Sequence, residues 1–67
     1  MKGVTIGERI RIKREEKNLS QGELAELIGV SQIMVSYYER DFKPMSFEMA
    51  IRIAKVLETT LDYLAGN

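Results

Sequence analysis

The chain has 67 residues, of which 45% are apolar and 30% are charged, a composition typical of one small globular domain over residues 1–67 and not of a disordered segment. It contains no cysteine and no histidine, which excludes disulfides, Cys/His metal sites and Ser-His or Cys-His nucleophiles. A domain this small rarely has a pocket deep enough to perturb its remaining titratable groups. We therefore expect neither an enzyme nor a bound cofactor or metal.

Charge is balanced over the whole chain but not along it. Ten Lys and Arg offset ten Asp and Glu, so the net charge is zero. The N-terminal residues 1–17 nevertheless hold more bases than acids; the bases are Lys2, Arg9, Arg11, Lys13, Arg14 and Lys17. No apolar run approaches the length of a membrane span, and charges interrupt the segment where a signal peptide would be apolar. We expect a cytoplasmic protein without membrane contact, whose basic end is N-terminal.

Helical segments follow one another along the chain, and the period-two alternation of strands is absent. The expected helices cover residues 6–17, 21–28, 32–40, 47–57 and one to two turns after residue 60. Each begins after a hydroxyl residue that can serve as its N-cap: Thr5, Ser20, Ser31, Ser46 and Thr60. Glu8 and Glu23 complete capping boxes in the first two helices. Gly29 and Gly66, which take positive φ without steric cost, end the second and fifth helices.

The second and third helices are joined only by Gly29, Val30 and Ser31. So short a link, with a left-handed glycine, forces the two helices to cross steeply rather than lie antiparallel. Ala25 is small where the crossing must be close. The apolar seam between the helices would consist of Leu24, Ile28, Val30, Val35 and Tyr38. These features predict a helix-turn-helix at about residues 21–40.

The remaining apolar pattern divides into a core stripe and exposed positions. The fourth helix is expected to turn a wide stripe inward, made of Phe47, Ala50, Ile51, Ile53, Ala54 and Leu57. Leu61 and Leu64 would face inward from the fifth helix. Ile12 and Leu27 fall outside the core by helical phase, where a shared patch could bind another protein.

The third helix has an exposed side suited to a DNA groove. With Val35 and Tyr38 facing inward, the opposite side presents Gln32, Ile33, Ser36, Tyr37 and Arg40. Glutamine can pair bidentately with adenine in the major groove, and an apolar side chain can lie against thymine methyl groups. Alternatively, this side of the helix could simply face solvent. That alternative suits the polar side chains Gln32 and Ser36 better than the apolar Ile33 and the aromatic Tyr37.

Several polar residues are candidates for phosphate contacts. Gln21 opens the second helix, where free backbone N–H groups favour an anion, and we prefer a phosphate contact there to the alternative of an ordinary first-turn polar residue. The basic candidates are Arg40, Lys43, Arg9 and Arg11. Each of these could instead only add solubility. Because DNA affinity rests largely on phosphate neutralisation, some of them must take part if the partner is DNA.

Four segments form a pattern at fixed spacing: LSQ at 19–21, ELAE at 23–26, IGVS at 28–31 and VSYYER at 35–40. This pattern resembles the Cro/C1-type helix-turn-helix domain of phage immunity repressors and their bacterial relatives. The match continues through FE at 47–48, IAK at 53–55 and TLDYL at 60–64. The resemblance implies an all-α, compact, five-helix, lambda-repressor-like domain with a central helix-turn-helix. It also implies a double-stranded operator DNA partner, bound by a two-fold homodimer.

The resemblance assigns roles to individual residues. It implies base contacts by Gln32, Ile33 and Tyr37, and a structural ion pair between Arg14 and Glu39 that holds the third helix against the first. The sequence departs from the family pattern at Asp41, where glycine is common. Aspartate tolerates left-handed backbone better than most residues, so the turn is expected to survive.

The fifth helix has two possible roles. The resemblance places the dimer interface there, at Leu61, Tyr63 and Leu64, whereas the sequence itself is equally consistent with a lid on the core. A chain of this length could be a whole small regulator or the N-terminal domain of a longer repressor.

We expect a sequence-specific transcriptional regulator, a repressor bound to a pseudo-palindromic site. Two further hypotheses remain open: an antitoxin or restriction-modification controller of the same fold, and a protein-interaction adaptor, which the zero net charge favours.

Overall fold

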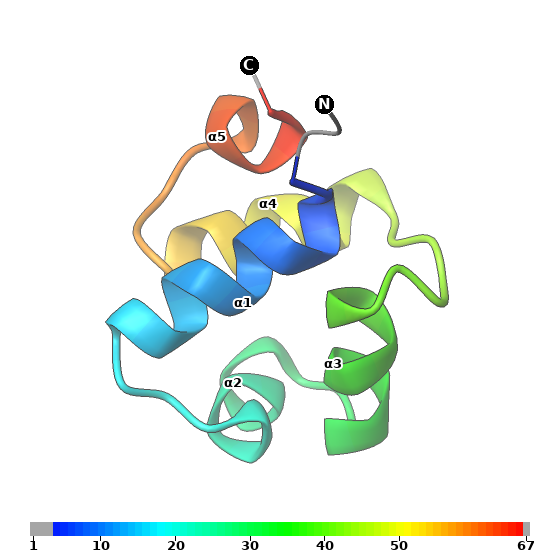
Figure 1. The fold of residues 1–67 in the computed structure, drawn as a ribbon. Helices are drawn as coiled ribbons and strands as arrows, with labels where there is room; N and C mark the ends of the chain where they lie inside the picture. Colours follow the sequence, from blue (N-terminus) through cyan, green and yellow to red (C-terminus); the bar gives the residue numbers. More distant parts are fainter. Residues whose placement is uncertain (1–3, 67) are drawn as a thin grey trace.

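The computed structural model describes residues 4–66, which form five helices and no strand (Figure 1). The helices are α1 (Ile6–Glu16), α2 (Gln21–Ile28), α3 (Gln32–Glu39), α4 (Phe47–Val56) and α5 (Leu61–Ala65). This confirms the all-α class and the order of the elements. Three helices end one residue earlier than expected, because Lys17, Arg40 and Leu57 are C-caps with a backbone outside helical geometry. The N-terminal Lys2 lies outside the described residues.

Local capping explains why the helices begin and end where they do. All five predicted N-caps are confirmed, since each side chain accepts a hydrogen bond from the backbone N–H three residues on. Both predicted capping boxes are present. Gly29 and Gly66 are left-handed, with φ of 80° and 89°. In the other three helices, the residue after the C-cap is left-handed and is not glycine: Asn18, Asp41 and Glu58.

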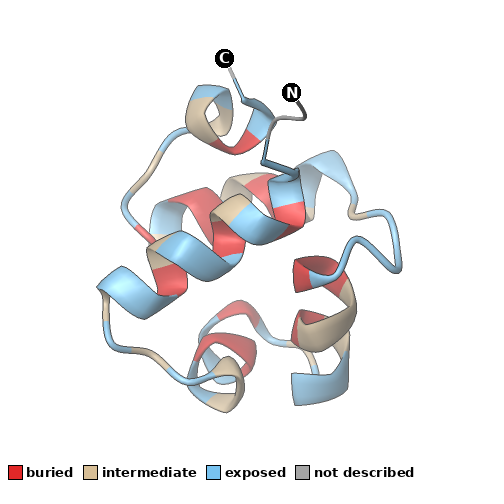
Figure 2. Ribbon diagram, in the orientation of Figure 1, coloured by how far each residue is buried: buried red, intermediate tan, exposed pale blue. Residues whose placement is uncertain are grey.

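One hydrophobic cluster joins all five helices. It includes Ile10 of α1, Leu24 of α2, Val35 of α3, Ile53 of α4 and Leu64 of α5. These residues are at most 1% exposed. Figure 2 shows the buried parts of the helices on sides that face one another. No helix in residues 4–66 is both long enough and apolar enough to cross a membrane.

The expectation that Phe47 belongs to the inner stripe of α4 is wrong. Its side chain is 70% exposed, whereas Ala50, Ile53, Ala54 and Leu57 of the same stripe are buried. Phe47 is the first residue of α4, and helical side chains tilt toward the N-terminus of their helix. The phenyl ring therefore extends past the part of α4 that other helices cover.

A close helix contact fixes α1 against the C-terminal end of α3. Gly7 lies at this contact, and a Cβ placed there would approach the carbonyl oxygens of Tyr38 and Glu39 to 2.4 Å and 2.5 Å. Its N–H also donates to Oδ1 of Asp41 at 3.0 Å, so a carboxylate sits at the N-terminus of α1. The packing therefore requires glycine at position 7.

Candidate nucleic-acid interface

The turn between α2 and α3 sets the direction of the third helix. The N–H groups of Gly29 and Val30 both donate to the carbonyl of Ala25, at 2.8 Å and 3.0 Å. Arg52 of α4 donates from Nη1 to the Ile28 carbonyl at 2.9 Å, which satisfies a free carbonyl at the end of α2. The two helices cross steeply, as the short link predicts (Figure 1). Sequence reasoning missed Arg52, because nothing local in the sequence links positions 28 and 52.

One side of α3 is buried and the other is open. Val35 and Tyr38 are 1% and 6% exposed. Gln32 is exposed, Ile33 is 63% exposed, and the nearby Ser36 and Tyr37 are half-buried. The predicted base-contacting residues thus share the accessible part of α3, and its N-terminal turn is the most open.

The N-terminal turns of α2 and α3 meet. A Cβ at Gly22 would lie 3.5 Å from Oε1 of Gln32, so the Gln32 side chain lies beside the first turn of α2. In that same turn, Gln21 donates from Nε2 to Oε1 of Glu39 at 3.0 Å. Gln21 is half-buried. The structure therefore places Gln21, the candidate phosphate contact, next to α3.

An ion pair lies between α1 and α3 where the sequence analysis expects it. Arg14 donates from Nε to Oε2 of Glu39 at 2.6 Å and from Nη2 to Oε1 at 3.1 Å, a bidentate arrangement. Its remaining nitrogen, Nη1, donates to the Leu19 carbonyl at 2.8 Å. Both residues are buried, at 8% and 6% exposure. These contacts orient the last turn of α3 relative to α1.

The electrostatics of this pair favour the charged form of Arg14. Hydrogen bonding to Glu39 raises the pKa of the Arg14 guanidinium above its ordinary value, against the opposing effect of burial. Glu39 also accepts the bond from Gln21, so three N–H donors surround its two oxygens. The network links the start of α2, the last turn of α1 and the end of α3.

A group of aromatic and basic side chains surrounds the end of α3. We call Tyr37, Arg40, Phe42 and Lys43 the α3-end cluster. The Tyr37 and Phe42 ring centroids are 5.4 Å apart, and the guanidinium of Arg40 lies 5.6 Å and 5.3 Å from these two rings. The amino group of Lys43 is 6.0 Å from the Tyr37 ring. Arg40 and Lys43 are exposed, so both are free to contact an anion beside α3.

The expectation that Arg9 contacts a phosphate is corrected by its position. Its guanidinium lies 5.1 Å from the Tyr63 ring, beside Gly66 at the end of α5, and its Nε is buried. Helix α5 lies at the opposite end of the molecule from α2 (Figure 1). Arg9 therefore packs between α1 and α5, while Arg11 is exposed and stays a candidate.

The residues of α5 that are expected at a dimer interface differ in how deeply they are buried. Leu64 is 1% exposed and belongs to the core, so the expectation that it contacts a second subunit is wrong. The physical reason is that α5 packs on α1 and α4, and Leu64 points into that contact. Leu61 and Tyr63 are half-buried and keep accessible surface.

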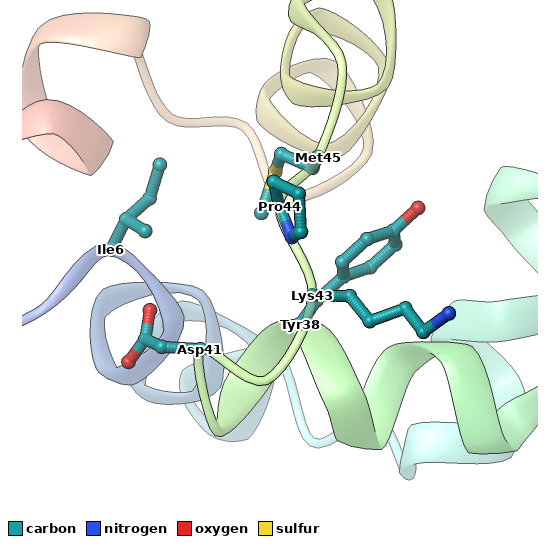
Figure 3. Close-up of a pocket in the computed structure, with 6 residues that line it drawn as sticks. All are labelled: Ile6, Tyr38, Asp41, Lys43, Pro44 and Met45. Atoms are coloured by element: carbon teal, nitrogen blue, oxygen red, sulfur yellow. The ribbon is translucent and has the colours of Figure 1, made fainter.

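A shallow hollow of about 410 Å³ lies between the start of α1, the end of α3 and the loop that follows α3. Its lining consists of Ile6, Tyr38, Asp41, Lys43, Pro44 and Met45 (Figure 3). The carboxylate of Asp41 is already bonded to Gly7, and the amino group of Lys43 extends away from Ile6 and Asp41 (Figure 3). The described residues contain no group of three or more acidic side chains able to hold a metal.

Comparison with known proteins gives a consistent set of relatives. A family model described as "Helix-turn-helix" matches residues 10–64. Repressor protein C2 of Salmonella phage P22 is 34% identical over 59 residues, which are 88% of this chain and 27% of that repressor. The crystal structure of the P22 c2 repressor with a synthetic operator superposes with a TM-score of 0.90 at 31% identity, covering 96% of this chain and 97% of that one.

A restriction-modification controller has the same fold. The C.AhdI protein of Aeromonas hydrophila superposes with a TM-score of 0.83 at 32% identity, covering 88% of this chain and 89% of that one. The chain spans half or less of the length of the curated relatives it matches.

Proposed function

This chain belongs to the helix-turn-helix family of DNA-binding transcription regulators, which are not enzymes, and we propose that it is a sequence-specific repressor that acts as a homodimer. Two copies of α3 enter successive major grooves about 34 Å apart on a pseudo-palindromic operator. Repression then follows from occupancy, because the bound dimer blocks polymerase. A protein with this partner works where the chromosome lies, in the cytoplasm of a bacterial or phage-infected cell.

The observation that carries the proposal is the open N-terminal half of α3. Ile33 is 63% exposed beside the exposed Gln32, while the opposite side of the helix is anchored in the core. An accessible aliphatic side chain beside an amide matches the methyl and hydrogen-bonding pattern of an A·T base pair in the major groove. Gln32, Ile33, Ser36 and Tyr37 are therefore assigned to base contacts.

The backbone contacts are assigned to groups that flank α3. Gln21 and the first N–H groups of α2 are assigned to one phosphate, and Arg40 and Lys43 supply positive charge at the C-terminal end of α3. Arg11 is the further candidate on α1. The dimer interface is assigned to α5, through the accessible parts of Leu61 and Tyr63.

Selection from a random duplex library at near-physiological salt tests the proposal. We expect an enriched inverted repeat with half-sites about one helical turn apart. The variant Gln32→Ala should lose preference at one base pair of each half-site, by about 1–3 kcal/mol. Leu27→Ala is the matched control, since Leu27 is 57% exposed on α2 outside the proposed contacts, and it should leave the selected sequence unchanged. Weak binding without enrichment would contradict sequence-specific recognition by this chain.

A second candidate is control of a restriction-modification system, which the likeness to C.AhdI favours. Both candidates use the same DNA contacts, so the selected operator does not separate them. Adjacent genes for a DNA methyltransferase and an endonuclease would decide for the controller. No binding to duplex DNA at any salt concentration would instead favour the adaptor hypothesis, with the exposed Ile12 and Leu27 as the first surface to test.

A further inference from the structure

The backbone that ends α3 brings Phe42 back over Tyr37. The N–H of Phe42 donates to the Tyr37 carbonyl at 2.8 Å, and the N–H of Asp41 donates to the Tyr38 carbonyl at 3.1 Å. Asp41 is left-handed, with φ of 58°. These are the two hydrogen bonds of a Schellman motif, in which the residue after the left-handed position often makes an apolar contact with the last turn of the helix. The ring contact is therefore fixed by the turn itself.

The contact restricts a side chain that is assigned to base recognition. The Tyr37 and Phe42 rings lie 5.4 Å apart at an interplanar angle of 34°, and Arg40 lies within 6 Å of both. Phe42 is nevertheless 68% exposed and belongs to no part of the core. Burial in the core thus does not account for a phenylalanine here, whereas its contact with Tyr37 is well defined.

We propose that Phe42 is a positioning residue that determines base specificity by holding the Tyr37 ring in its DNA-facing orientation. The inference rests on the proposed function, in which Tyr37 contacts a base. A side chain already held in one rotamer loses less conformational freedom on binding, and it discriminates bases better than one that can move to suit any of them. Phe42 supplies this restraint from a loop position without contacting the base.

The test compares four variants on the operator selected by the wild-type protein and on its single-base-pair substitutions. Tyr37→Ala first identifies the base pair whose preference depends on Tyr37. Phe42→Leu should reduce discrimination at that same base pair by about threefold to tenfold, the range expected for loss of an aromatic pair. Phe42→Tyr keeps the ring and should restore discrimination. Phe47→Leu is the matched control, since Phe47 is 70% exposed and should change nothing.

A double-variant cycle separates positioning from a direct contact. If Phe42 acts through Tyr37, Phe42→Leu has no further effect on discrimination in the Tyr37→Ala background. An equal loss of affinity for every sequence, or a loss that persists without Tyr37, would overturn the inference and make Phe42 a direct DNA contact or a folding residue. Thermal unfolding followed by circular dichroism checks that each variant is folded.

The failures of the two proposals are distinguishable. If the wild-type protein enriches no sequence, the proposed function fails and the inference fails with it. If the wild-type protein enriches an operator and Phe42→Leu discriminates equally well, only the inference fails. A further check needs no DNA: nuclear Overhauser effects between the two rings are expected in the free protein, and Phe42→Leu should give averaged side-chain couplings at Tyr37.

Discussion

Replacing Glu39 with alanine tests the ion pair between α1 and the end of α3. The substitution removes both bonds from Arg14 and the bond from Gln21. Arg14 stays buried at 8% exposure, with the Leu19 carbonyl as its main remaining partner. Removing one partner of a buried pair leaves an uncompensated charge and costs about 3–5 kcal/mol.

That loss is large for a domain of this size. At about 0.05–0.15 kcal/mol per residue, the whole domain has roughly 3–10 kcal/mol of stability. Each kcal/mol corresponds to about 4–8 °C in a domain this small. Glu39→Ala should therefore lower the melting temperature by at least about 12 °C, and at the lower end of the stability range it should unfold the protein.

Thermal unfolding by circular dichroism, with urea unfolding at 25 °C, measures the effect. The double variant Arg14→Met with Glu39→Leu is the informative companion, because replacing both partners with apolar residues removes the unpaired charge and should recover most of the stability. A melting temperature for Glu39→Ala within about 2 °C of the wild type, less than the effect of 1 kcal/mol, would refute the reasoning. Such a result would mean that water reaches Arg14 when the carboxylate is absent.

Three further predictions concern separate parts of the molecule. Gly7→Ala places a Cβ against the backbone of α3 and should destabilise the fold by about 1–3 kcal/mol or more in urea unfolding, whereas an unchanged midpoint would contradict the close contact. The hydrogen bond from Lys17 and its charge lower the pKa of Glu58, so this contribution to stability is present above the ordinary glutamate pKa and is lost as the pH falls through the lowered value. Glu58→Gln should therefore lower the melting temperature slightly at pH 7 and in low salt, and the difference from wild type should disappear as the pH falls through the lowered pKa of Glu58. Lys43→Gln should weaken DNA binding about equally for all sequences and reduce the slope of log affinity against log salt concentration by about one. Arg9→Gln should leave this slope unchanged.

Helix boundaries were predictable because their determinants are local. Ser20 and Glu23 cap each other three residues apart, and Gly29 ends the same helix eight residues after it begins. Asp41 takes left-handed geometry, as the sequence analysis expects. Such interactions depend on neighbours in the chain, and the printed sequence contains them directly.

Contacts between distant helices were less predictable. The helical phase of Arg9 is compatible with a DNA-facing position, and only the placement of α5 shows that its guanidinium lies on Tyr63. The sequence is compatible with Leu64 in the core or in a dimer interface, because an apolar residue on a short helix fits either position. Arg52 gives no sequence signal at all for its bond to Ile28.

The same difference between local and long-range interactions applies to the candidate site. The exposed side of α3 could be predicted from the helical periodicity of its sequence, because Val35 and Tyr38 anchor the opposite side in the core. The contact between Phe42 and Tyr37 did not, because an aromatic residue in a loop carries no periodic signal. It becomes visible only when the hydrogen bonds of the turn are known.

Asp41 joins the end of one helix to the beginning of another. Its backbone closes the last turn of α3, and its carboxylate accepts the N–H of Gly7 in the first turn of α1. Fraying of either terminus therefore breaks a contact that the other requires, so the two ends open as one cooperative unit. Amide hydrogen exchange would show this as similar opening free energies for the N–H groups of Gly7 and Phe42, although 35 positions separate them in the chain.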